Sequence, residues 1–229
     1  IETVMARYAG RVRYWDVVNE PIGPWDHRPG NLRAGPFYRA LGEDYIARAF
    51  KRARATAPGD VLVLNEAQCE TADDNGETFR TSLLALLRRM KEQGVPIDAV
   101  GFQSHLKLAA KYDFAAFAAY LHEVASLGFA IHITELDVND TNVSGDEAAR
   151  DRAVAQMYRG YLDAVLRVPA VNVVQTWQLS DATSWMNDPA TQARMHVRTS
   201  PRPLPYDAQF QRKPAWDAIA AAFEAAPPR

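Results

Sequence analysis

The chain has 229 residues, 24% of which are charged, and its formal net charge is −2 at pH 7. This near balance gives no reason to expect nucleic acid or an anionic membrane surface as a partner. No apolar run approaches the roughly 20 residues that a membrane-spanning helix needs. Cys69 is the single cysteine, so no disulfide can form within the chain.

Short β-rich runs alternate with amphipathic helical patterns along the chain. Helices are predicted from apolar residues spaced three and four apart. Asp113 and Asp146 suit helix N-caps, Gly94 and Gly128 suit helix ends, and Pro214 suits a first helical turn. The predicted elements, in chain order, are a strand over 12–18, a helix over 41–57, a strand over 61–64, a helix through 79–90, a strand over 99–102, a helix between 113 and 128, a strand over 130–134, a helix between 146 and 165, a strand over 171–176 and a helix from 213.

Strands that alternate with helices of this length predict βαβ units and a parallel sheet. The strands are nearly all apolar, as expected when both faces of a sheet are covered. No low-complexity segment or linker divides the sequence, so we expect residues 1–229 to form a single α/β domain.

Polar or aromatic residues follow every predicted strand. Carboxyl ends of parallel strands lie on one face, where such folds place their sites. The alternative is that each residue merely caps a helix or opens a solvated loop. The residues concerned are Asn19 and Glu20, Asn65 and Glu66, Gln103 to His105, Glu135 and Asp137, and Trp177, Asp181 and Trp185.

Glu20 and Glu135 are candidates for paired carboxylate chemistry, because they end different strands on the same face. Hydrolysis of a glycosidic bond needs one carboxyl group to protonate the leaving oxygen and another to attack or stabilise the sugar. The spacing also predicts that Asp137 orients His105, which donates a hydrogen bond to Glu135. Strict alternation places Asn19 and Glu20 on opposite faces, so both can reach a substrate only if this strand end is irregular.

Trp177 and Trp185 flank the predicted site, and an indole ring is suited to stacking on a sugar face. The alternative is that both are core residues. The sequence contains no cysteine or histidine pair at zinc spacing, no glycine-rich phosphate loop and no serine elbow. We therefore expect neither a metal nor another cofactor.

Five segments, in order, resemble glycoside hydrolase family 10, the endo-1,4-β-xylanases. They are residues 15–21 (WDVVNEP), 101–106 (GFQSHL), 133–138 (ITELDV), 177–185 (WQLSDATSW) and 212–215 (RKPA). The resemblance implies a (β/α)8 TIM barrel of which this chain supplies strands four to eight, without the first three. It also implies a secreted, retaining enzyme that cleaves internal bonds of xylan.

The resemblance further implies a role for each candidate residue. Glu20 would be the acid/base and Glu135 the nucleophile, which Asp137 would support through His105. The residues that would bind substrate are Asn19, Gln103, His105, Trp177 and Trp185. A β-1,4-glucanase or cellulase and a non-catalytic xylan-binding relic remain alternatives.

The chain departs from the family pattern at several places. The segment Asn65 to Gln68 lacks an aromatic residue often found there, and Gln178 stands where a small residue is usual. Without the first three strands, the sheet would have two unpaired edges and an exposed apolar face, which favour association. We therefore expect the chain to form a homo-oligomer or to pair with a complementary N-terminal fragment.

Overall fold

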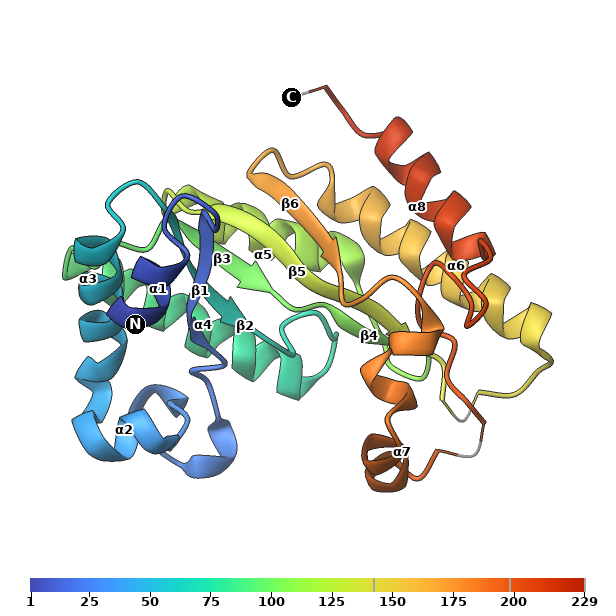
Figure 1. The fold of residues 1–229 in the computed structure, drawn as a ribbon, viewed down its shortest axis with the longest axis horizontal. Coiled ribbons are helices and arrows are strands. Elements are labelled where there is room, and N and C mark those ends of the chain that lie inside the picture. Colours follow the sequence, from blue (N-terminus) through green and yellow to red (C-terminus); the bar gives the residue numbers. More distant parts are fainter. Residues whose placement is uncertain (142, 198, 229) are drawn as a thin grey trace.

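The structure, a computed structural model, describes residues 1–141, 143–197 and 199–228. Strands and helices alternate through most of this length (Figure 1). The strands are β1 (Tyr14–Asn19), β2 (Val61–Glu66), β3 (Ala99–Phe102), β4 (His105–Lys107), β5 (Ala130–Asn139) and β6 (Val171–Thr176). The α-helices are α1 (Glu2–Arg7), α2 (Pro36–Leu41), α3 (Tyr45–Thr56), α4 (Asp74–Glu92), α5 (Phe114–Ser126), α6 (Glu147–Val165), α7 (Pro189–Met195) and α8 (Pro214–Glu224).

Every strand pairing in the described part of the chain is parallel. The order β1-β2-β3-β5-β6 follows the sequence, so each crossover joins neighbouring strands. All carboxyl ends therefore lie on one side of the sheet, the lower side in Figure 1, together with the loop after β1 and with α7. The predicted parallel α/β architecture is confirmed.

The structure differs from the sequence prediction at three elements. The strand expected over 130–134 extends to Asn139, so Glu135 and Asp137 lie within β5. The helix expected over 41–57 begins only at Tyr45, because Gly42 adopts a left-handed φ of 68° and separates α2 from α3. A sixth strand, β4, was not predicted. Both β3 and β4 pair with β5, but their registers differ by one residue. Ala99 of β3 lies opposite Ala130, whereas His105 of β4 lies opposite Asp137.

The predicted helix caps are confirmed. The side chains of Asp113 and Asp146 accept hydrogen bonds from the backbone N–H groups of Ala116 and Ala149, respectively. These bonds satisfy amides that have no partner within the helix. Pro214 occupies the first turn of α8.

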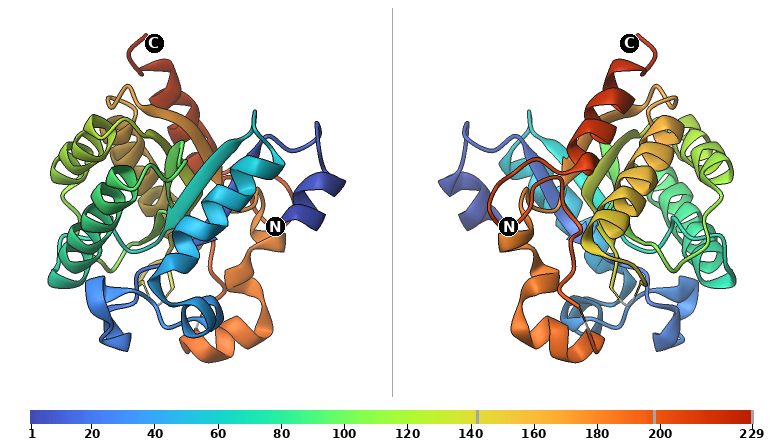
Figure 2. Two further views of the ribbon diagram at one scale, coloured as in Figure 1. Left: turned by 90° about the vertical axis from the view of Figure 1, so that its left-hand side faces the viewer. Right: turned by 90° about the vertical axis from the view of Figure 1, so that its right-hand side faces the viewer.

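The hydrophobic core lies between the central strands and the long helices. α4 and α5 line one side of the sheet, and α7 lies on the other side (Figure 2, left). β2 and β3 are buried along almost their whole length, whereas the edge strands β1 and β6 are largely exposed or half-buried. The interior strands have neighbours on both sides, and the edge strands have one.

Candidate active site

The backbone hydrogen bonds of the sheet include Glu20, Gln103 and Trp177, which follow their strands, and Glu135, which lies within β5. Each strand end is thereby fixed to its neighbour, which sets the position of each candidate residue along the strand direction. The bonds run from Glu20 N to Asn65 O (2.9 Å), from Gln103 N to Glu66 O (2.9 Å), from Glu135 N to Gln103 O (3.0 Å) and from Trp177 N to Leu136 O (3.1 Å).

The end of β1 is irregular, as it must be for Asn19 and Glu20 to serve one site. The pairing of β1 with β2 shifts register between Asp16 and Val18, and Glu20 has a left-handed φ of 51°. A register shift of this kind re-aims the side chains that follow it. Both side chains consequently accept from the same donor, Gln103 Nε2, at 3.2 Å for Asn19 Oδ1 and 3.0 Å for Glu20 Oε1.

Glu135 is held by hydrogen bonds from two other strands, β2 and β4. Asn65 Nδ2 donates to its Oε1 over 2.9 Å, and His105 Nε2 lies 3.2 Å from its Oε2. His105 Nδ1 lies 2.8 Å from Oδ1 of Asp137, which is fully buried. The hydrogen-bond chain from Asp137 through His105 to Glu135, predicted from the strand spacing, is present.

The protonation of His105 follows from this arrangement. Burial alone lowers the pKa of an imidazole, but the hydrogen bonds and charges of Asp137 and Glu135 outweigh it and raise the pKa of His105 to about 10. His105 is thus a cation at neutral pH and donates from both ring nitrogens.

A continuous hydrogen-bond network joins the two candidate acids. Glu20 and Asn19 share the amide of Gln103, and Asn65 Nδ2 donates both to Asn19 Oδ1 (3.0 Å) and to Glu135 Oε1 (2.9 Å). Glu20 and Glu135, which are far apart in sequence, therefore face one shared polar surface.

The two tryptophans flank His105. The Trp185 ring centroid lies 5.4 Å from that of His105, and its Nε1 donates to Asp137 Oδ2 over 2.8 Å. Trp177 meets His105 edge-on at 6.4 Å and is 38% exposed, so it is not a core residue. The amide oxygen of Gln178 accepts from Trp185 N (2.9 Å) and ties the two segments together.

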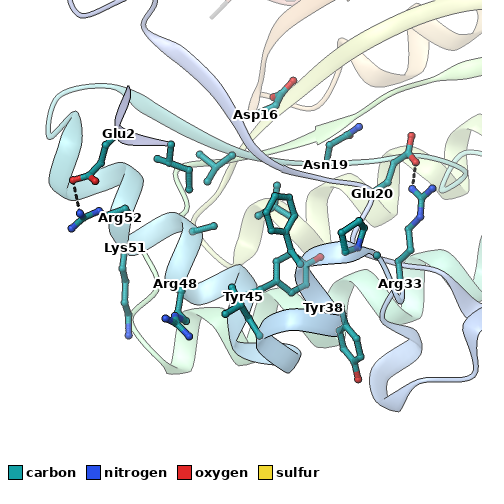
Figure 3. Close-up of a pocket in the computed structure, with 18 of the residues that line it drawn as sticks. Glu2, Asp16, Asn19, Glu20, Arg33, Tyr38, Tyr45, Arg48, Lys51 and Arg52 are labelled. Carbon is teal, nitrogen blue, oxygen red and sulfur yellow. Dashed lines mark hydrogen bonds and ion pairs between the residues drawn. The ribbon is translucent and has the colours of Figure 1, made fainter. Parts of the chain in front are cut away.

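Two residues at the site were not among the sequence candidates. Asn65 was noted as a strand end, and its polar side chain after an apolar strand was the available signal. Arg33 forms an ion pair with Glu20 (Figure 3), and no sequence pattern points to it. It reaches Glu20 because the loop after β1 turns back, with Ile22 bridged to Leu32.

The described residues show no metal centre, since nowhere in 1–141, 143–197 and 199–228 do three or more His, Cys, Asp or Glu side chains group as a metal site requires. In the same part of the chain, none of the helices combines the length and the apolar character needed to cross a bilayer. The arrangement instead offers two carboxyl groups, a cationic histidine, amides and exposed indoles. This set suits acid/base and nucleophilic chemistry on a sugar.

Comparison with known proteins gives a consistent result. The family model described as glycosyl hydrolase family 10 matches residues 1–222. Endo-1,4-beta-xylanase 5 from Pyricularia oryzae is 33% identical over 227 residues, which are 99% of this chain and 52% of that protein. Native xylanase 10B from Thermotoga maritima superposes with a TM-score of 0.83 at 29% identity, covering 97% of this chain and 64% of that one.

Xylanase 10B from Thermotoga petrophila, solved in complex with xylobiose, gives a TM-score of 0.82 at 29% identity and covers 97% of this chain and 63% of that one. The chain thus spans about half the length of the curated relative and about two thirds of the solved structures. Its open parallel sheet is an incomplete (β/α)8 barrel.

Proposed function

Because this chain belongs to glycosyl hydrolase family 10, we propose that it carries the catalytic pair of a retaining endo-1,4-β-xylanase. The observation that carries the proposal is the hydrogen-bond network that brings Glu20 and Glu135 to one surface through Gln103, Asn19 and Asn65. Residues 1–229 would act as part of a single catalytic domain.

The proposed reaction has two displacements. In the first, the Glu135 carboxylate attacks the anomeric carbon while the Glu20 carboxyl group transfers its proton to the glycosidic oxygen, so that the C–O bond breaks and a glycosyl ester forms. In the second, Glu20 accepts a proton from water, the water oxygen attacks the anomeric carbon, and Glu135 leaves as a carboxylate. The β configuration is retained after two inversions.

The neighbouring residues would support these steps. His105, oriented by Asp137, would hold the Glu135 carboxylate in one rotamer through the 3.2 Å contact. Asn19 and Gln103 would donate or accept at the sugar beside the cleaved bond. The exposed Trp177 and the partly buried Trp185 would provide apolar surface for further sugar units.

The proposed substrate is xylan or xylo-oligosaccharides. Support comes from the similar xylanase 10B of Thermotoga petrophila, which was solved in complex with xylobiose. A polymeric substrate also suits a secreted enzyme, which is the location that the family resemblance implies.

We further propose that the free edge of β1 accepts another βα segment, from an N-terminal fragment or from a second copy. A groove of about 1170 Å³ runs along this edge, between β1, α2 and α3. Its lining includes the exposed Phe37 and Leu41, and the ion pairs Glu20–Arg33 and Glu2–Arg52 lie at opposite ends (Figure 3). An unpaired strand beside exposed apolar side chains favours such pairing.

Hydrolysis by the wild type, Glu20→Ala and Glu135→Ala tests the proposed roles, with aryl xylobiosides and xylo-oligosaccharides as substrates. Glu135→Ala should abolish turnover of every substrate. Glu20→Ala should lose about 10²- to 10⁴-fold on oligosaccharides but keep a fast first step with a good aryl leaving group, which needs little protonation.

Faster hydrolysis of cello-oligosaccharides than of xylo-oligosaccharides would instead make the protein a glucanase. Binding of xylo-oligosaccharides without turnover by the wild type would leave only a binding function.

A further inference from the structure

Two buried carboxyl groups, at the last residue of β2 and four residues beyond it, take no part in the proposed reaction. Glu66 is 0% exposed and Glu70 is 4% exposed. Neither forms an ion pair with lysine or arginine in the part of the chain that the structure describes. A buried carboxyl group is costly unless hydrogen bonds satisfy it, so the partners of these two groups indicate what they do.

Glu66 holds the backbone just after Glu20. Its Oε2 accepts from Ile22 N over 2.9 Å, and its Oε1 accepts from Ala67 N over 2.9 Å. Pro21 has no N–H group, so the amide of Ile22 is the first donor after Glu20 that a neighbour can fix. Glu20 itself has φ 51°, a backbone conformation that non-glycine residues rarely adopt without support.

Glu70 holds the backbone just before His105. Its Oε1 accepts from Ser104 N over 2.9 Å and lies 3.2 Å from Ser104 Oγ. Ser104 is also left-handed, with φ 62°, and its hydroxyl lies 2.6 Å from the hydroxyl of Tyr161 on α6. The next residue, His105, contacts Glu135.

From this geometry we infer that Glu66 and Glu70 are positioning residues, Glu66 for the acid/base Glu20 and Glu70 for His105 and hence for the nucleophile Glu135. The inference rests on the proposed function, because it assigns each carboxyl group to one half of the catalytic pair. Both act through a strained backbone segment, and neither touches the substrate.

The chemistry of Glu66 indicates a conservative variant. Burial raises the pKa of Glu66 to about 8, against the effect of its two N–H donors. The group is therefore largely neutral at pH 7, and Glu66→Gln keeps its length, its neutrality and one of its two acceptor oxygens. Leucine has a similar volume but no acceptor, so Glu66→Leu and Glu70→Leu remove the hydrogen bonds with little change of packing.

The first experiment compares kcat/KM for two aryl xylobiosides, one with a good and one with a poor leaving group. Glu66→Leu should lose about 10²-fold more on the poor leaving group than on the good one, since only that reaction needs the acid. Glu70→Leu should slow both substrates by a similar factor. The Gln variants, which keep an acceptor oxygen, should recover part of each loss. Glu92→Leu, at an exposed position on α4, should change kcat/KM for neither substrate.

Equal losses on both substrates for Glu66→Leu, or a leaving-group dependence for Glu70→Leu, would overturn the assignment. If the Leu variants do not fold, the smaller losses of the Gln variants provide the test. The loss must depend on the leaving group for Glu66→Gln and be independent of it for Glu70→Gln.

The second experiment reads the backbone directly and does not depend on activity. Amide hydrogen exchange should accelerate at Ile22 in Glu66→Leu and at Ser104 in Glu70→Leu, with the other amide unchanged in each case, and the Gln variants should show smaller increases at the same amides. Unchanged exchange at both amides would refute the inference. A wild type that folds but hydrolyses no xyloside would refute the proposed function, while the exchange pattern would still decide whether the two carboxyl groups hold these segments.

Discussion

At the scale of single residues, His105 sets the electrostatics of the site. It bridges the buried Asp137 and the nearly buried Glu135, whose side chain is 12% exposed. A cation between two carboxylates offsets the repulsion that would otherwise oppose placing them so close together. The same contacts fix the ring orientation, because each nitrogen has its own acceptor.

The protonation of His105 is directly testable. Its folded pKa of about 10 exceeds its ordinary value of 6.5, so the folded state binds this proton more tightly than the unfolded state. The resulting stability is fully present below pH 6.5 and is lost as the pH rises toward 10. Between these limits the free energy of unfolding of wild type should fall by on the order of 3 kcal/mol more than that of His105→Gln.

Denaturant titrations across this range measure that difference, and the ring nitrogen shifts in NMR should show an imidazolium at pH 8. A His105 that titrates near 6.5 would refute this account of the site.

At the scale of secondary-structure elements, the sequence predicted the parts that depend on local patterns. The apolar runs gave the strand–helix alternation, and Asp113, Asp146 and Pro214 marked helix starts that the structure confirms. β4 was missed because it contains one apolar residue, Leu106, and exists through pairing with residues 137–139 of β5. A strand defined by distant partners leaves little local signal.

The same reasoning separates the predicted from the unpredicted site residues. Residues close to the carboxyl end of an apolar run are placed by the parallel topology, and this predicted Glu20, His105 and Glu135 as candidates. Arg33 is placed by the path of a loop. Its backbone N–H donates a hydrogen bond to Pro21 O (2.7 Å), and its Cα and Cβ lie close to Gly23. The sequence shows no pattern that predicts this folding back of the loop.

The segment that carries Trp185 is fixed by a buried lysine at the start of α8. Lys213 is 3% exposed, and its Nζ donates to Asp181 Oδ2 (2.9 Å) and to Arg202 O (2.7 Å) and lies 3.2 Å from Asp151 Oδ1. Lys213→Met would leave the buried Asp181 carboxylate without its cation, whereas Asp151 keeps its ion pair with Arg202. We expect a loss of about 3–5 kcal/mol in the free energy of unfolding.

The matched control for this prediction is Arg159→Ala, which removes an exposed i,i+4 ion pair with Asp163 and should cost about 0.5 kcal/mol or less. Urea unfolding of both variants provides the comparison. Equal midpoints for the two variants would show that Lys213 does not hold this segment.

At the scale of the whole molecule, the sheet has two open edges. β1 pairs only with β2, and β6 only with β5, in the described residues. Exposed backbone donors and acceptors along β1 lie beside the groove lined by Phe37 and Leu41. Glu20 and Glu135 therefore lie on a sheet that the described residues leave open at both edges.

Association through this groove should be visible in solution. Light scattering of the chain should give a mass above its 25.5 kDa, or a defined complex when a matching N-terminal βα fragment is supplied. Phe37→Lys and Leu41→Lys, at exposed positions, should weaken association without unfolding the chain. Phe223→Lys, at an exposed position on α8, serves as the control. A monodisperse monomer that forms no complex with the fragment would contradict the proposed partner surface.

The proposed roles of Glu20 as acid/base and Glu135 as nucleophile are tested most directly by adding azide to Glu20→Ala with an activated aryl xylobioside. With Glu135 intact, the glycosyl ester forms on one face of the sugar and azide, which needs no proton removed, attacks from the other. The account predicts faster turnover and a β-xylobiosyl azide. An α-azide, or no azide product from a folded variant, would contradict it.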